Sequence, residues 1–153
     1  MAYLIGVALA LATMGLSRVV GFDRDRALYP VMLIVIGSYY ELFAAISGSG
    51  LVLLSETIAF AVFVALACLG FARWRWLVAI GLAGHGMFDA VHSHVINNPG
   101  VPTWWPPFCL SFDFVVALGV AVPLTSRGDL KARTPAVPPR ASQSHSQSPH
   151  GNQ

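Results

Sequence analysis

Five long apolar runs constrain this chain more than any other feature of its sequence. Each is close to the roughly 17–25 residues that a helix needs to cross the hydrocarbon core of a bilayer. Only 10% of the residues are charged and 56% are hydrophobic, whereas a soluble domain carries about 25% charged residues. We therefore predict an all-α polytopic integral membrane bundle, formed by residues 1–125, with five transmembrane helices over Tyr3–Val20, Ala27–Ser47, Gly50–Phe71, Trp76–His94 and Pro107–Leu124.

The positively charged residues predict the orientation of this bundle. With five spans, all nine Lys and Arg residues fall on one side, and neither the SGSG turn nor the loop at residues 95–106 carries any. Positively charged loops stay in the cytoplasm, so the N-terminus is expected outside and the C-terminus inside. No Lys or Arg precedes the first run, which is therefore expected to be a true span and not a signal peptide. The formal net charge of +2 reflects this topology, and nothing in the sequence supports binding to nucleic acid.

Residues 126–153 differ in composition and are rich in Pro, Ser and Gln. Such a segment has too few apolar residues to form a core, and we predict a disordered cytoplasmic tail in which His145 and His150 have no role. Cys68 and Cys109 are expected near opposite faces of the membrane. A disulfide needs Cα atoms within about 7 Å of each other, so no disulfide is expected.

One acidic residue lies inside each of the last four predicted spans. At a rise of about 1.5 Å per residue, each of these residues is ~8–10 Å below the outer end of its helix. The turn Ser47-Gly48-Ser49-Gly50 supports this common depth, because two of the acidic residues are equidistant from its centre. We therefore predict a layer of carboxyl groups in the outer leaflet, formed by Glu41, Glu56, Asp89 and Asp113.

Two histidines accompany the acidic residue of the fourth span. His85, Asp89 and His92 are spaced i, i+4, i+7, which places them on one face of a helix. An Asp or Lys at the centre of a span costs ~2.5–3.5 kcal/mol, so these groups are expected to face the interior. Glycine and alanine residues beside them keep this helix slim, so that neighbouring helices can approach closely.

The combined group has two interpretations. Carboxyl groups so close together cannot all be ionised, so with the histidines they form a set of proton donors and acceptors. Ionisable groups within a membrane are candidates for function by default, although polar groups can also simply hold helices together. We predict a functional site. Its candidate catalytic residues, which would also be the ligands of any bound metal, are His85, Asp89, His92, Asp113, Glu41 and Glu56.

Part of this pattern resembles a known family. The motif H-x-x-x-D-x-x-H (His85, Asp89, His92), then Asn98-Pro99, then C-x-x-x-D (Cys109, Asp113) is similar to a pattern in a family of small bacterial integral membrane proteins, known only as a domain of unknown function. The resemblance covers about residues 81–120. It implies a multi-pass protein of the bacterial inner membrane, and it implies no activity.

Three classes of function remain open from the residues. The first is an enzyme that performs acid–base chemistry, such as isomerisation or cyclisation, on a lipophilic substrate from the outer leaflet. The second is a membrane protein with a divalent metal as cofactor, since carboxylates and histidines form di-metal sites in helical bundles. The third is a proton- or cation-coupled carrier, in which such residues act as relays. Membrane lipid and a lipophilic small molecule are the expected partners, and the oligomeric state stays open.

The outer loop, residues 97–107, is predicted to cover the polar site. Its four prolines and one glycine cannot continue a helix, while Trp104 and Trp105 favour the membrane interface. We expect the loop to fold back over the outer mouth of the bundle and to offer aromatic walls to an apolar ligand. In the alternative, the two tryptophans only anchor the fifth helix.

Overall fold

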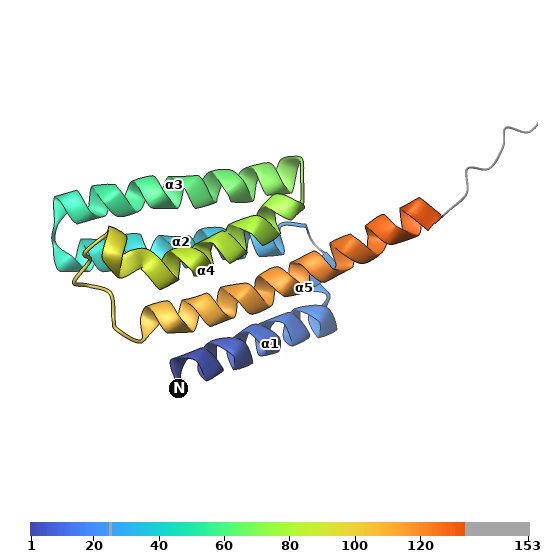
Figure 1. Cartoon of the computed structure of the whole chain (residues 1–153), viewed down its shortest axis with the longest axis horizontal. Coiled ribbons are helices and arrows are strands. Elements are labelled where there is room, and N and C mark those ends of the chain that lie inside the picture. The colour runs from blue at the N-terminus through green and yellow to red at the C-terminus, as the bar shows by residue number, and fades with distance from the viewer. Residues whose placement is uncertain (25, 134–153) are drawn as a thin grey trace, which may run out of the picture.

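The computed structural model describes residues 1–24 and 26–133, with side chains up to Thr125. The described residues form five α-helices and one short 3-10 helix and contain no strand, and Figure 1 shows how the helices are arranged. The all-α prediction is therefore confirmed, and the bounds of the first four long helices lie close to the predicted ones. The elements are α1 (Ala2–Val20), η1 (Phe22–Arg24), α2 (Leu28–Ser47), α3 (Gly50–Ala72), α4 (Trp76–Val95) and α5 (Trp105–Arg133).

Glycine residues end the first two long helices. Gly21 follows α1 with φ of 88°, and Gly48 follows α2 with φ of 74°. Both adopt the left-handed conformation that glycine reaches without steric cost. Ser49 then begins α3, and its side chain accepts a hydrogen bond from the Val52 N–H at 3.5 Å. The sequence Ser-Gly-Ser-Gly thus forms a tight turn between two antiparallel helices.

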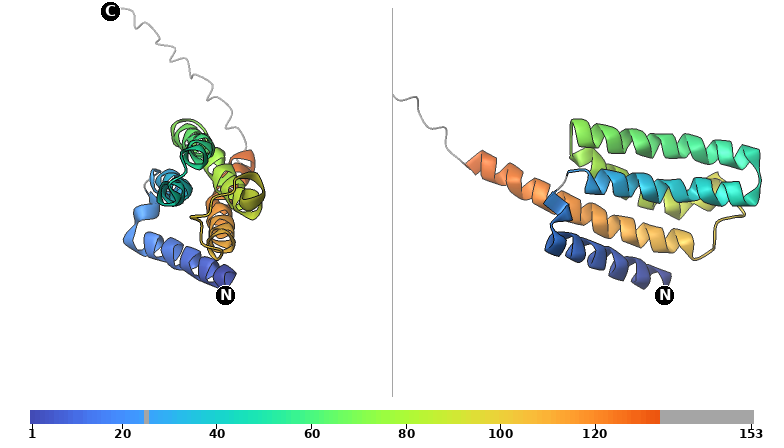
Figure 2. Two further views of the ribbon diagram at one scale, coloured as in Figure 1. Left: turned by 90° about the vertical axis from the view of Figure 1, so that its left-hand side faces the viewer. Right: turned by 180° about the vertical axis from the view of Figure 1, so that it is seen from behind.

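The helices run alternately up and down the bundle (Figure 1). α5 packs between α1 and α4, and α2 packs on α3. α4 contacts α2 and α3 as well as α5, which makes it the most enclosed helix. The end-on view in Figure 2 shows α1 at the edge of the bundle, far from α3.

Small residues on α4 allow this close packing. A Cβ atom on Gly81 would lie 2.5 Å from the Leu33 Cδ2 atom of α2, and one on Gly86 would lie 3.2 Å from the Leu110 carbonyl oxygen of α5. Both distances are shorter than ordinary contacts. The glycines therefore bring α2 and α5 close to α4, and through them the side chains of the polar site.

Four of the five helices are long and apolar enough to cross a membrane: α1, α2, α3 and the Trp105–Thr125 part of α5. Large apolar side chains on their outer surfaces, such as Leu11, Leu54 and Ile58, are exposed, which suits contact with lipid. α4, with 20 residues, is also long enough to cross a membrane. It is not among these four helices, because its polar residues and glycines lower its mean hydropathy. The count of five spans and the orientation of the termini stay predictions.

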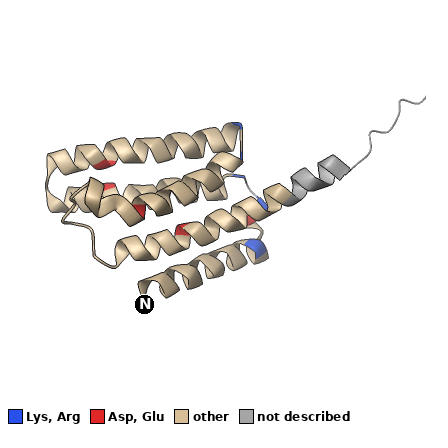
Figure 3. Ribbon diagram, in the orientation of Figure 1, with Lys and Arg blue, Asp and Glu red and all other residues tan. Residues whose placement is uncertain are grey.

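Charged residues are separated along the bundle. In Figure 3 the Lys and Arg residues with described side chains lie at one end, where α1 ends and α2 begins. Acidic residues also lie within the helices, away from this end (Figure 3), whereas Asp23 in η1 lies among the basic residues. The one-sided distribution of positive charge on which the predicted orientation depends is therefore present in the fold.

The C-terminal region differs from its prediction. α5 continues to Arg133, so the expected disordered tail does not begin at residue 126. Propensity explains this, because the sequence at residues 126–133 holds several good helix formers and no proline. Residues 134–153, with His145 and His150, lie outside the described residues. Cys68 and Cys109 are both free, as expected.

Candidate functional site

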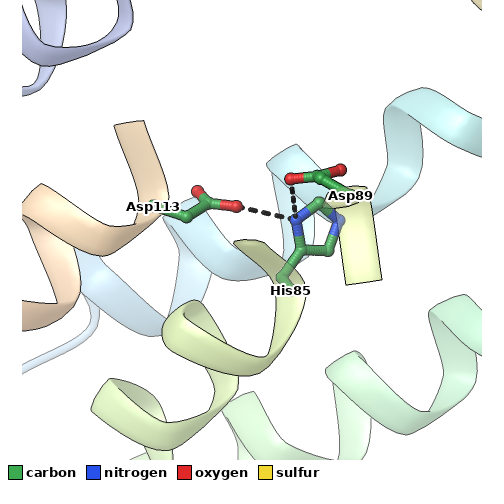
Figure 4. Close-up of side chains that lie close together, drawn as sticks. All are labelled: His85, Asp89 and Asp113. Carbon is green, nitrogen blue, oxygen red and sulfur yellow. Dashed lines mark hydrogen bonds and ion pairs between the residues drawn. The ribbon is translucent and has the colours of Figure 1, made fainter. Parts of the chain in front are cut away.

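The polar site begins with His85, which lies between two carboxyl groups (Figure 4). Its Nδ1 atom is 2.7 Å from Asp113 Oδ2 on α5 and 3.4 Å from Asp89 Oδ2, one turn further along α4. All three side chains are at most 2% exposed. The i, i+4 spacing on α4 and the close approach of α5 at Gly86 thus bring one imidazole and two carboxyl groups together.

Tyr40 of α2 connects this group to the second histidine. The Tyr40 hydroxyl donates a hydrogen bond of 2.6 Å to Asp89 Oδ1. The Tyr40 ring stacks on the His92 ring, with 4.0 Å between centroids and an interplanar angle of 19°. Tyr40 is 2% exposed. It therefore holds Asp89 and His92 in fixed positions relative to each other.

His92 forms a second pair of its own. Its Nε2 atom lies 2.8 Å from Glu56 Oε1 on α3. The same carboxylate oxygen accepts a hydrogen bond of 2.9 Å from Asn98 Nδ2, in the loop between α4 and α5. Asn98 Nδ2 also donates to the Tyr40 carbonyl oxygen at 3.2 Å. Side chains from α2, α3, α4, α5 and this loop thus form one continuous network.

The network contains five of the six residues that the sequence predicts. His85, Asp89, His92, Asp113 and Glu56 come together, but Glu41 is half-buried and its carboxyl group has no hydrogen bond or ion pair to another described residue. The prediction that Glu41 faces the site is therefore not matched by the geometry. His94 is exposed and does not belong to the network.

Sequence reasoning assigned no role to Tyr40 or Asn98. The signal for Tyr40 is its spacing from Leu33, Ile36 and Ala44, which are also buried in α2. Such positions recur every three or four residues on one face of a helix. Glu41 follows Tyr40 and is rotated by about 100° around the helix axis, away from that face. Asn98 belongs to the motif that resembles the known family. Because it lies in a loop, no helical spacing predicts its contacts with Glu56 and Tyr40.

Three carboxylate oxygens of the network have no hydrogen-bond partner among the described residues. They are Asp89 Oδ2, Asp113 Oδ1 and Glu56 Oε2, and all three are buried. The ligand atoms of His85, Asp89 and Asp113 lie within 4.8 Å of one another. This group has the residue types and the spacing to hold a metal ion.

A cavity of about 440 Å³ lies beside the network, under the loop between α4 and α5. Asp89, His92 and Asn98 line it, together with Tyr3 of α1 and several loop residues. The loop therefore forms part of the wall of the cavity, and its role as a lid stays a prediction. The expectation of aromatic walls is wrong, because neither Trp104 nor Trp105 is among the lining residues.

The two tryptophans lie elsewhere on the surface of the bundle. Trp105 packs against Tyr39 and Phe43 of α2, with ring centroids 4.8 Å and 5.1 Å away. Trp104 is 54% exposed and packs edge to face on Trp105. Their contacts fit the alternative in which they anchor the start of α5.

An apolar layer closes the network on the side of the basic end. Leu33 of α2, Leu82 of α4 and Val116 of α5 are all 0% exposed and belong to the hydrophobic core. On its helix, each of these residues lies between the basic end of the bundle and the residue that belongs to the network. The polar site is therefore reached from the cavity under the loop and is separated from the opposite end by packed side chains.

The structure defines the class as a helical bundle with a buried network of carboxyl and imidazole groups inside it, and the length and composition of its apolar helices suggest a multi-pass membrane protein. The chain belongs to a family of unknown function, DUF6010, whose family model matches residues 1–123. The match includes every residue of the network and confirms the resemblance to a domain of unknown function. No curated protein and no solved structure matches this chain.

Proposed function

We propose that this protein is an intramembrane enzyme that performs acid–base chemistry on a lipophilic substrate. One observation carries the proposal: Asp89 and His92 line the same cavity, and each is positioned by further buried polar groups. An isomerisation or cyclisation of an alkene, epoxide or enone needs a proton donor and a proton acceptor in a pocket with little water. The cavity offers both kinds of group on one wall.

His92 and Glu56 form the proposed acid–base pair. Glu56 Oε1 is 2.8 Å from His92 Nε2, so the carboxylate fixes the ring orientation, and stacking on Tyr40 holds the ring plane. A positioned imidazole that takes a proton from one carbon of a substrate and returns it to another contributes typically about 10²–10⁴-fold in rate. Asp89 is the second group at the cavity wall, and Tyr40 and His85 position it.

The position of the cavity supports a lipophilic substrate. Its lining includes Tyr3 of α1 together with Ala90 and Ser93 of α4, and the latter two are exposed on the outer surface of the bundle. α1 packs mainly on α5, which leaves the side between α1 and α4 facing lipid. A substrate dissolved in the bilayer can therefore reach the cavity from the side.

The closed core favours an enzyme over a carrier. A carrier needs a route from the site to each side of the membrane, whereas Leu33, Leu82 and Val116 fill the interior on the basic side. We place the protein in a bacterial cytoplasmic membrane with five spans, the N-terminus outside and the C-terminus inside. In this orientation the cavity lies in the outer leaflet.

Deuterium incorporation into a mixture of natural lipids tests this function. The purified full-length protein in vesicles is incubated in D₂O with the total lipid extract of the cells that produce it, and the lipids are analysed by mass spectrometry. We expect a lipid species whose mass increases with the wild type. With His92→Gln, the loss of the imidazole should lower this incorporation by at least about 100-fold.

His94→Gln is the matched control, because His94 is an exposed histidine on the same helix. It should leave the incorporation unchanged. Equal labelling with the wild type and with His92→Gln, or no labelled species with either, would overturn the proposed function.

A further inference from the structure

We propose that His85, Asp89 and Asp113 bind one divalent transition-metal ion. These residues offer a ring nitrogen and two carboxylate oxygens from two helices, all within 4.8 Å of one another. Nδ1 of His85 is 2.7 Å and 3.4 Å from the two nearest carboxylate oxygens. In a tetrahedral site with metal–ligand bonds of about 2.0–2.2 Å, neighbouring ligand atoms lie about 3.3 Å apart. Small shifts of the side chains bring the three groups to these distances.

The unpartnered oxygens are the second observation that indicates a cation. Asp113 Oδ1 has neither a hydrogen bond nor an ion pair in the part of the chain that the structure describes, and Asp89 Oδ2 has only the 3.4 Å ion pair with His85. Their residues are 0% and 2% exposed. A buried oxygen without a partner is costly. A divalent cation between the two carboxylates would give Asp113 Oδ1 a partner, would add a stronger partner for Asp89 Oδ2 and would balance both negative charges.

Tyr40 prepares Asp89 for this role. Its hydroxyl donates to Asp89 Oδ1, which leaves Oδ2 on the side of His85. Hydrogen bonds of this kind orient the carboxylates that bind metals in proteins. The pair of His92 and Glu56 lies on the other side of Tyr40 and has no part in the metal site.

The ligand types indicate which metal fits. Imidazole nitrogen together with carboxylate oxygen suits Zn²⁺, Fe²⁺ or Mn²⁺, whereas Ca²⁺ and Mg²⁺ take oxygen ligands. Three protein ligands with a free position are typical of catalytic zinc sites. Because Asp89 also lines the cavity, a ligand or water on the metal can be reached from there. His92 and Glu56 then remain the acid–base pair, so the metal site does not depend on the proposed function.

Zinc binding to the full-length, detergent-purified protein tests the inference. The protein is purified through a tag without histidine, treated with a chelator, and dialysed against Zn²⁺ before metal analysis. We expect about one Zn²⁺ per chain in the wild type, and loss of affinity by more than roughly 100-fold in His85→Gln and Asp113→Asn. Tyr40→Phe keeps all three ligands and should weaken binding by about tenfold or more, as seen when a partner of a ligand is removed.

Glu41→Gln and His94→Gln are the matched controls, since they remove an acid and a histidine outside the site. Both should bind Zn²⁺ like the wild type. Co²⁺ provides a second measurement, because its visible absorption bands in the wild type should change in Tyr40→Phe even if the ligand variants fail to fold. A wild type without bound Zn²⁺, or undiminished binding in His85→Gln, would overturn the inference. Deuterium labelling by a metal-free wild type would leave the proposed function intact.

Discussion

Asn98 connects the loop between α4 and α5 to the helices around the site. Its Nδ2 atom donates to Glu56 and to the Tyr40 carbonyl oxygen, and its Oδ1 atom accepts from the Gly100 N–H at 3.1 Å. A Cβ atom on Gly100 would collide with the Phe43 carbonyl oxygen of α2. The loop is therefore seated against the bundle by one amide side chain and one close backbone contact.

Removal of the Asn98 side chain should destabilise the protein. Asn98→Ala leaves Glu56 Oε1 with one partner fewer and removes three hydrogen bonds, and the loss of a buried polar partner costs about 1–3 kcal/mol. We expect a lower melting temperature in detergent. The neighbouring residue provides the control, because Asn97 is exposed and Asn97→Ala should melt like the wild type. Equal melting of the two variants would show that the contacts of Asn98 contribute nothing.

At the residue scale, the sequence predicts five residues of the network, from their spacing on α4 and from the common depth of the acidic residues on α3 and α5. The spacing of His85, Asp89 and His92 is sufficient to place them on one face of α4. The rotation of α2 could not be derived in the same way, because the side that faces lipid is as apolar as the side that faces the core. In the sequence, the charge of Glu41 makes it the stronger candidate for a site residue. In the structure, Tyr40 and not Glu41 lies on the buried face of α2.

At the scale of elements, α4 is unusual because its polar face points inward. Met87, Val91 and Val95 are exposed, while Gly81, His85, Asp89 and His92 are buried among α2, α3 and α5. A helix surrounded in this way can carry polar residues without exposing them to lipid. This arrangement reconciles its low hydropathy with a membrane-spanning position.

The crossing of α4 can be tested with reporter fusions. If all five helices span, a reporter fused after Asn97 should be periplasmic and one fused at Ser126 cytoplasmic, because the positively charged loops stay inside. A third fusion, after Trp74, should also be cytoplasmic and serves as a control for the basic end. Reporters after Asn97 and at Ser126 on the same side would contradict the five-span arrangement.

The sequence was sufficient to predict where the first four long helices begin and end, but not which helices pack against each other. The apolar runs and the glycines at positions 21 and 48 set the bounds of α1 and α2 to within a residue or two. The packing of α5 between α1 and α4 depends instead on shape, through contacts such as Gly86 against α5. Apolar side chains that face lipid or a neighbouring helix look alike in the sequence.

At the scale of the whole molecule, three layers follow one another along the bundle. Basic residues lie at one end (Figure 3), and buried apolar side chains such as Leu33, Leu82 and Val116 come next. The polar network and its cavity lie beyond them, under the loop between α4 and α5. This order gives a site that is closed on the basic side and reached from the cavity on the other.

The central claim is that the buried network is a functional site and does not merely hold the helices together. Asp89→Asn tests it most directly, because an amide keeps the shape of the side chain and can still accept from Tyr40. We predict membrane abundance and melting temperature close to those of Glu41→Gln, with deuterium incorporation lowered by at least about 100-fold. Loss of Asp89→Asn from the membrane while Glu41→Gln remains, or full incorporation by a folded Asp89→Asn, would contradict the claim.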